Sequence, residues 1–348
     1  MTVKPGAIRF NTDSMKLEIF RGSANYEGSA SMAGIGTLAA GQWEEIVAYS
    51  DFDRGHNGSG GRGVFGGGAP FDNTIMFITI PSKGDAQDFG DLTQSKSGCG
   101  SVSSSTRGVF AYGEVPGGTD VDVMEYITIA STGKALDFGD LPREGHSPGP
   151  VGNSVRGIFC GGGTPSNFAN MDFITMSTLG NSAEFGDLTA ARRRSSAGNN
   201  AIRGVIFGGS GDTTTIDYVT ISTLGDALDF GDMFTGGYAG QSGNIASRTR
   251  AYTAGGYFAP AYNNHIQYVQ IMSTGNSIDS GDLTGSEGNC AGCSNGTRGV
   301  RGGGSSPTRV NIIDFWGLQS GGNAVDFGDL SNGNRSEISG VSDSHGGV

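Results

Sequence analysis

Two cysteines separated by two residues are the first candidates for chemistry in this sequence. Cys290 and Cys293 have the spacing of half a zinc site or of a thiol redox motif. A structural zinc site needs a second pair of ligands, and a redox motif needs a βαβ unit; the sequence offers neither. Cys290 precedes Arg298 by the same eight residues that separate Cys99 from Arg107. We therefore interpret these cysteines as small residues of an inner strand and predict no metal site.

The histidines and glycine clusters match no familiar catalytic pattern. Strings such as Gly66–Gly68 lack the Gly-Lys-Ser/Thr that a phosphate-binding loop requires. No Ser/His/Asp set or paired carboxylates stand out. We expect no catalytic residue and no cofactor. We expect structural hydrogen bonds from the four histidines, which are His56, His146, His265 and His345.

Twelve charged residues recur at an interval of about 47 residues. A catalytic ring is one interpretation, but a charge that occurs once per repeat is more simply a contact at each junction between repeats. We predict that these side chains form ion pairs or bind backbone carbonyls and amides between strands. The arginines are Arg62, Arg107, Arg156, Arg203, Arg250 and Arg298, and the aspartates are Asp91, Asp140, Asp187, Asp232, Asp282 and Asp329.

Composition narrows the class of protein. Glycine accounts for 64 of 348 residues, yet there is no collagen-like period, and 35 % hydrophobic with 16 % charged residues does not fit a charged disordered chain. A net charge of −12 argues against nucleic acid as a partner, despite the short basic cluster at residues 192–194. No apolar run of membrane-spanning length and no signal peptide is apparent, so we expect a soluble protein made in a cytoplasm, without membrane insertion.

The repeats are predicted to be all-β. Segments rich in Ile, Val, Thr, Phe and Tyr alternate with Gly, Ser, Asn and Asp turns, and no segment shows a sustained helical period. Each repeat reads as four short strands, a to d, with a Ser-Thr-Gly or Ser-Thr-Leu-Gly turn between c and d. In the unit that begins near Arg194, these strands span residues 194–200, 203–209, 215–222 and 227–232.

The repeats resemble those of the kelch family. Strand b ends in a double glycine in most units, Tyr126, Tyr218 and Tyr268 occupy strand c, and Phe replaces the family's Trp in strand d. The resemblance implies a β-propeller of four-stranded blades. It also invites comparison with the copper enzyme galactose oxidase, but no matching set of two Tyr, two His and a Cys is found.

We predict seven blades in a single domain, residues 1–348. Seven small-residue a segments can be counted, from one near Arg54 to one that begins at Arg335. Six full repeats fill residues 49–334. The N-terminal residues 1–48, with Trp43 at the kelch Trp position, are expected to supply strands b, c and d of the terminal blade, and residues 335–348 its strand a. The Gly/Ala/Ser-rich stretch 22–41 then forms a long loop.

The N-terminal segment carries a second resemblance. Residues 6–14, 16–18 and 43–46 are similar to a segment common in tail-fibre and other virion proteins of tailed bacteriophages, particularly marine and cyanobacterial ones, which also encode Gly-rich propellers with such repeats. The resemblance implies a non-enzymatic virion structural protein, a tail-fibre, tail-tip or capsid-surface module, assembled in the host cytoplasm. Other virion proteins, a host-surface glycan or receptor, and copies of the same chain are its expected partners.

The loop between strands b and c varies most between repeats. Aromatic residues beside Asn and Asp there suit sugar binding or docking of a virion protein, although ordinary loops with semi-buried aromatics remain an alternative. A cellular kelch interaction module and a carbohydrate-active or copper enzyme are the other functions considered. The candidate binding residues are Phe71, Asn73, Phe168, Asn170, Tyr257, Phe258, Tyr262 and Asn263.

Overall fold

The computed structural model describes residues 8–11, 16–21, 42–45, 61–211, 213–235 and 242–348. The chain divides into two compact units, Met1–Arg54 and Gly55–Val348. Regular structure in the described residues is entirely β-strand. Those residues include no helix long and apolar enough to span a membrane.

The first unit contains a three-stranded antiparallel sheet. Its strands are β1 (Ile8–Asn11), β2 (Lys16–Arg21) and β3 (Gln42–Glu45), in the order β1-β2-β3. Trp43 lies in β3 opposite Phe20. The stretch 22–41 that was predicted to be a loop lies outside the described residues.

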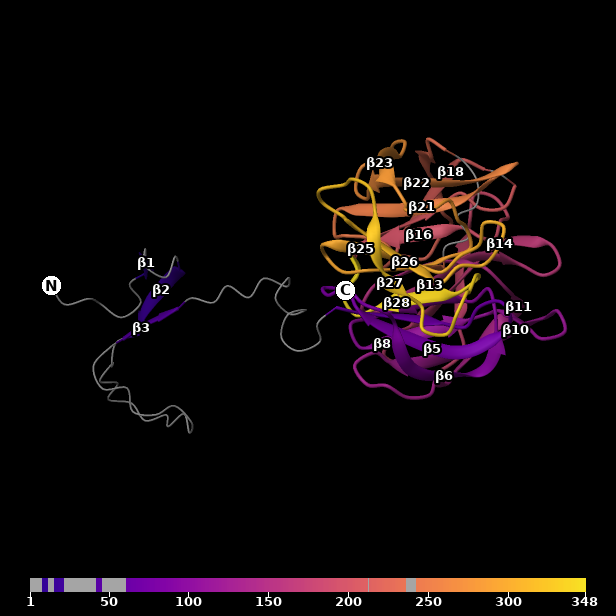
Figure 1. Ribbon diagram of the computed structural model, residues 1–348, viewed down its shortest axis with the longest axis horizontal. Coiled ribbons are helices and arrows are strands. Elements are labelled where there is room, and N and C mark those ends of the chain that lie inside the picture. Colours follow the sequence, from indigo (N-terminus) through magenta and orange to yellow (C-terminus); the bar gives the residue numbers. More distant parts are fainter. Residues whose placement is uncertain (1–7, 12–15, 22–41, 46–60, 212, 236–241) are drawn as a thin grey trace. The chain divides into compact units, whose positions relative to one another are not determined.

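The second unit is a β-propeller with six blades, each built around an antiparallel sheet (Figure 1). Blade 1 contains β28 (Ser339–Ser342), β4 (Arg62–Gly66), β5 (Asp72–Thr79) and β6 (Gln87–Lys96). Blade 2 contains β7 (Gly100–Ser103), β8 (Arg107–Ala111), β10 (Thr119–Thr128) and β11 (Leu136–Gly145), with the short β9 (Glu114–Val115) paired to β10. Blade 3 contains β12 (Gly149–Gly152), β13 (Arg156–Gly163), β14 (Asn167–Thr175) and β15 (Ala183–Asp187).

The remaining blades repeat this order. Blade 4 contains β16 (Ser196–Asn199), β17 (Arg203–Phe207), β18 (Thr215–Thr220) and β19 (Leu228–Asp232). Blade 5 contains β21 (Arg250–Phe258), β22 (Ala261–Gln270) and β23 (Ile278–Asp282), and residues 245–247 bond to β21 at the inner position. Blade 6 contains β24 (Ala291–Ser294), β25 (Arg298–Gly302), β26 (Ile312–Gly317) and β27 (Val325–Asp329), and β20 (Ser242–Gly243) pairs in parallel with β24.

The predicted seventh blade is wrong. Strand β28 pairs with β4, so the C-terminal segment supplies the inner strand of the first complete repeat rather than of an additional blade. The N-terminal strands pair with one another and do not enter a blade. The sequence analysis gave the first repeat an inner strand near Arg54 and placed the segment from Arg335 in a separate terminal blade. A blade needs only one inner strand, and the first repeat takes its inner strand from the C-terminal segment. The segment 54–60 lies outside the described residues.

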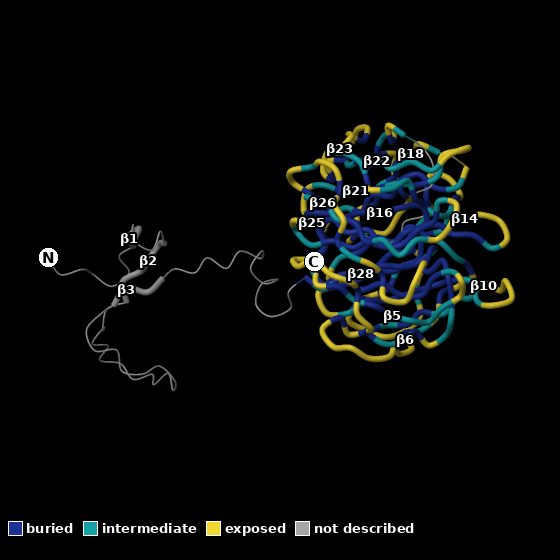
Figure 2. The backbone as a smooth tube through the Cα atoms, in the orientation of Figure 1, coloured by how far each residue is buried: buried dark blue, intermediate teal, exposed yellow. Residues whose placement is uncertain are grey.

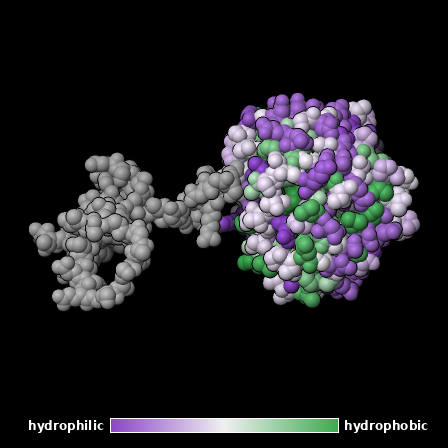
Figure 3. Space-filling view, turned by 90° about the horizontal axis from the view of Figure 1, so that it is seen from below, coloured by the Kyte–Doolittle hydropathy of each residue, from purple (hydrophilic) through white to green (hydrophobic). Residues whose placement is uncertain are grey.

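Apolar contacts between neighbouring blades form the core. One cluster joins Phe65 and Met76 of blade 1 to Val300 and Ile313 of blade 6, and all four side chains are at most 1 % exposed. Inner strands are buried along their whole length, whereas exposed residues gather at the outer strands and turns (Figure 2). The surface mixes polar and apolar residues (Figure 3).

The six recurring arginines bind backbone carbonyls, one of the two contacts that the sequence analysis left open. Each donates from Nη1 to a carbonyl of the next blade, and the sixth returns to the first. Each guanidinium also lies 4.2–4.8 Å from the centre of an aromatic ring on strand c of its own blade. The hydrogen-bonded pairs are Arg62–Ile129, Arg107–Met176, Arg156–Ile221, Arg203–Ile271, Arg250–Leu318 and Arg298–Ile80.

The recurring aspartates all contact the next blade through their backbone at the outer edge, and the Asp91 carboxylate also forms an exposed ion pair with Lys134 of the next blade at 3.7 Å. The Asp140 carbonyl accepts a hydrogen bond from the Ser182 amide of the next blade, and the same bond recurs at all six junctions, where Asp329 closes the ring onto Ala86. The glycine before each aspartate lies against the c–d turn of the next blade. A Cβ at Gly139 would lie 2.5 Å from the carbonyl of Gly180. The recurring Gly-Asp pair therefore forms the outer contact of each blade with the next.

The segment Ser344–Val348 fills the axis at the end where the inner strands finish. The His345 Nε2–H donates to the Ser103 carbonyl of blade 2 at 3.0 Å, and the Gly346 amide donates to Ala246 of blade 5 at 3.0 Å. Nδ1 of His345 accepts from the Gly347 amide at 3.1 Å. The imidazole is therefore neutral, and its burial lowers the pKa of His345 to about 4.

We expect this histidine to make stability depend on pH. The unfolded imidazole takes up a proton near pH 6.5, whereas the folded one resists protonation down to about pH 4, so stability is lost as pH falls between these values. The loss approaches about 3 kcal/mol. Urea unfolding of the wild type and His345→Gln at pH 7 and pH 4 measures it. Carboxyl groups such as Asp343 titrate in both proteins, so their effect cancels in the difference between the two unfolding free energies. If that difference does not change with pH, His345 is not the source of the pH dependence.

Candidate binding face

The inner strands of the blades begin close together at one end of the propeller axis. The residue two positions before each described inner strand has a left-handed backbone, with φ between 53° and 66°. Their backbones bond to one another across blades, for example from the Ser147 amide to the Gly98 carbonyl at 2.6 Å and from the Arg194 amide to the Ser147 carbonyl at 2.7 Å. The members are Gly98, Ser147, Arg194, Asn289 and Glu337, and the position in blade 5 falls outside the described residues.

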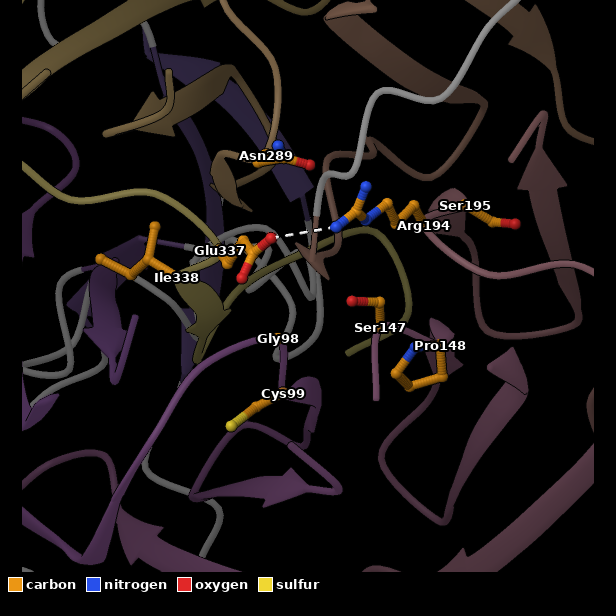
Figure 4. Close-up of a pocket in the computed structure, with 9 residues that line it drawn as sticks. All are labelled: Gly98, Cys99, Ser147, Pro148, Arg194, Ser195, Asn289, Glu337 and Ile338. Carbon is orange, nitrogen blue, oxygen red and sulfur yellow. Dashed lines mark hydrogen bonds and ion pairs between the residues drawn. The ribbon is translucent and has the colours of Figure 1, made fainter. Parts of the chain in front are cut away.

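We call the end of the axis that these residues surround the mouth. Side chains from opposite blades meet across it. Arg194 of blade 4 and Glu337 of blade 1 form an ion pair, with Nη2 and Oε1 separated by 3.2 Å (Figure 4). The cavity beneath them, lined also by Cys99 and Pro148, measures about 10 Å³, which is about the space of one water molecule. The cavity that the described residues enclose here therefore has room for about one water molecule.

A wider groove adjoins the mouth between blades 6 and 1. Its volume of about 610 Å³ falls in the range of small-ligand sites. Its lining is mostly polar, and Asn289 and Glu337 belong to both the groove and the mouth. Arg309, from the b–c loop of blade 6, donates from Nε to the Ser336 hydroxyl at 3.2 Å. The other lining residues are Ala69, Ser305, Pro307, Thr308 and Asn334.

The predicted loop residues do not assemble into one site. Phe71 and Phe258 are 38 % and 47 % exposed, on blades 1 and 5. Tyr257 and Tyr262 face each other edge to face with ring centres 5.0 Å apart, and Phe168 packs against Tyr112.

Two of the predicted asparagines form hydrogen bonds within their own blades. Asn170 donates from Nδ2 to the Asp187 carboxylate at 3.1 Å, and Asn263 accepts from the His265 amide at 3.3 Å. Asn73 is half-buried in β5. Phe71, two residues after Ala69, is the predicted residue nearest in sequence to the groove lining.

Sequence reasoning missed the groove and the mouth. Arg309 stands in a b–c loop that was recognised as variable, but Glu337 was assigned to an inner strand and Asn334 to the end of the sixth repeat. Non-glycine residues with a left-handed backbone leave no clear signal in a sequence.

Several buried charged groups lie between neighbouring blades. Ion pairs join the end of one blade to strand c of the next, as in Lys96–Glu125 at 2.6 Å and Arg192–Asp217 at 2.8 Å. Burial raises the pKa of the Asp172 carboxyl, which pairs with Arg143 at 2.5 Å. These ion pairs join neighbouring blades.

Burial also makes the cysteines poor nucleophiles. It raises the pKa of the Cys99 and Cys290 thiols to about 11, and it raises that of Cys160 and Cys293 as well. The thiols are therefore protonated at neutral pH.

Comparison with protein-family models finds no family that matches the chain, and comparison with curated proteins finds no significant match.

Proposed function

We propose that the chain is a non-enzymatic virion component of a tailed bacteriophage whose kelch-like propeller presents a binding face. One observation carries the proposal. The guanidinium groups that recur in every blade bind the next blade and close the ring, whereas the groove and the blade-specific loops are left open on one face. A rigid scaffold with variable loops at one end is the usual architecture of a binding protein.

The N-terminal unit supports a place in a particle. The segment that resembles phage tail-fibre proteins lies within Met1–Arg54, a compact unit distinct from the propeller. An attachment unit joined to a binding unit suits a tail fibre, tail tip or capsid surface. Mass spectrometry of purified virions is the direct test. Detection at a stoichiometric level supports the proposal, and absence from particles would turn attention to a cellular kelch interaction module.

We propose a host-surface glycan as the ligand of the groove. Hydroxyl, amide and guanidinium groups of Ser305, Asn334 and Arg309 match the donors and acceptors of a sugar, and the Pro307 ring offers a small apolar surface. A strongly anionic ligand is disfavoured by the net charge of −12.

Substitution in the groove should weaken glycan binding. The double variant Arg309→Ala, Asn334→Ala removes three or more hydrogen bonds to a bound sugar, and we expect at least a tenfold loss on a glycan array. Leu224→Ala, at an exposed c–d turn on the other face, is the matched control and should bind as the wild type does. Equal binding by all three proteins would remove the groove from consideration, and Phe258→Ala would then test the blade 5 loop.

A further inference from the structure

A cluster of potential metal ligands lies on the loop face of blades 2 and 3. Glu114 and Asp120 stand opposite each other in the β9–β10 hairpin, and His146 comes from the connection that precedes β12. One ligand atom from each of the three side chains lies within 4.8 Å of the others. Glu114 and Asp120 lie 32 and 26 residues before His146, so no short motif announces the cluster.

The hydrogen bonds of His146 show which of its ring nitrogens carries the proton. Its Nε2 lies 2.9 Å from Nη1 of Arg193, and its Nδ1 lies 2.8 Å from Oδ1 of Asp120. A guanidinium only donates, so Nε2 is the acceptor and Nδ1 carries the proton that is donated to Asp120. The His146 and Asp120 side chains are only 15 % and 10 % exposed, which strengthens electrostatic interactions there.

The two carboxylates are poorly compensated. Like charges directly opposite each other destabilise a strand pair. Arg193 contacts the imidazole, and among the described residues no side chain forms an ion pair or hydrogen bond with the Glu114 carboxylate. A divalent cation between the carboxylates would remove this repulsion.

We propose that Glu114, Asp120 and His146 bind a divalent transition metal ion, with Zn²⁺ as the best match. One imidazole with two carboxylates is a donor set that zinc accepts, and water would complete a tetrahedral site. The ion would link the blade 2 hairpin to blade 3.

Arg193 opposes this binding whichever nitrogen coordinates the metal. Coordination through Nε2 displaces the guanidinium directly. Coordination through Nδ1 moves the proton to Nε2, which can then no longer accept from Arg193. Removing the guanidinium should therefore strengthen metal binding, whereas a purely structural Asp–His–Arg network would gain nothing from its loss.

Calorimetric titration of the chelator-treated full chain with ZnCl₂ tests the site. We expect one ion per chain, at least tenfold weaker binding in Asp120→Asn and His146→Ala, and about tenfold tighter binding in Arg193→Ala. His265→Ala is the control, because His265 pairs with Asp282 at 3.4 Å in an exposed position outside the cluster. It should bind zinc as the wild type does.

Thermal unfolding with and without ZnCl₂ checks that each variant folds and gives a second readout. Zinc should raise the melting temperature of the wild type and of Arg193→Ala, and should not raise that of Asp120→Asn. Absence of binding in both the wild type and Arg193→Ala would overturn the proposal. So would an equal loss of affinity in His265→Ala.

Discussion

Replacing Asp217 with alanine is expected to lower the free energy of unfolding by about 3–5 kcal/mol. Asp217 is fully buried in β18, where its carboxylate contacts the Arg192 guanidinium at 2.8 Å and the Thr189 hydroxyl at 2.7 Å. Without this partner, Arg192 remains a buried charge with nothing to compensate it, since its side chain is only 2 % exposed. Urea unfolding followed by circular dichroism measures the loss.

A double variant separates the charge from the packing. Asp217→Met with Arg192→Met removes both charges, and Met76 already occupies the equivalent position of blade 1, opposite Phe65 as Asp217 is opposite Ile206. We expect the double variant to recover at least half of the lost stability. A double variant no more stable than Asp217→Ala would show that the unpaired charge is not the cause.

The burial of these acidic residues could not be predicted from the sequence. The strand assignments in blade 4 were correct to within about two residues, from β16 to β19. Alternation in strand c, however, would place Glu125 on the opposite face from Met124, and both are fully buried. A blade is covered by a neighbour on each side, so a period of two does not distinguish inside from outside.

The prediction of seven blades was wrong for a different reason. The repeat period and the turn glycines are local properties, so they could be recognised in the sequence. Which inner strand joins which blade depends on a pairing between Ser339–Ser342 and Arg62–Gly66, whose partners stand 273 to 279 residues apart. Closure at six or seven blades was therefore not determined by any local pattern.

The candidate site was the least predictable part. The aromatic loops were visible in the sequence because each lies within one blade. The groove and the mouth combine Asn289 and Arg309 of blade 6 with Glu337 of blade 1, and the residues that line them stand out only once the ring is closed.

Replacing Gly139 with alanine is expected to cost about 3 kcal/mol or more. Its φ of +140° is unfavourable for alanine by about 1 kcal/mol. An added Cβ would also lie 2.5 Å from the Gly180 carbonyl, a backbone group that cannot move without separating blades 2 and 3, and such overpacking costs a further 1–3 kcal/mol or so. Urea unfolding of the full chain measures the total.

The chain supplies a matched control in the glycine on the other side of the contact. Gly180 has almost the same φ, +139°, but nothing lies within 4 Å of its added Cβ, so Gly180→Ala should show the backbone penalty alone, about 1 kcal/mol. Gly231 and Gly225, both with φ of +142°, repeat the comparison at other junctions. Equal losses within each pair would mean that backbone conformation alone accounts for these glycines. A consistent excess at Gly139 and Gly231 would assign the recurring glycine to the contact between blades.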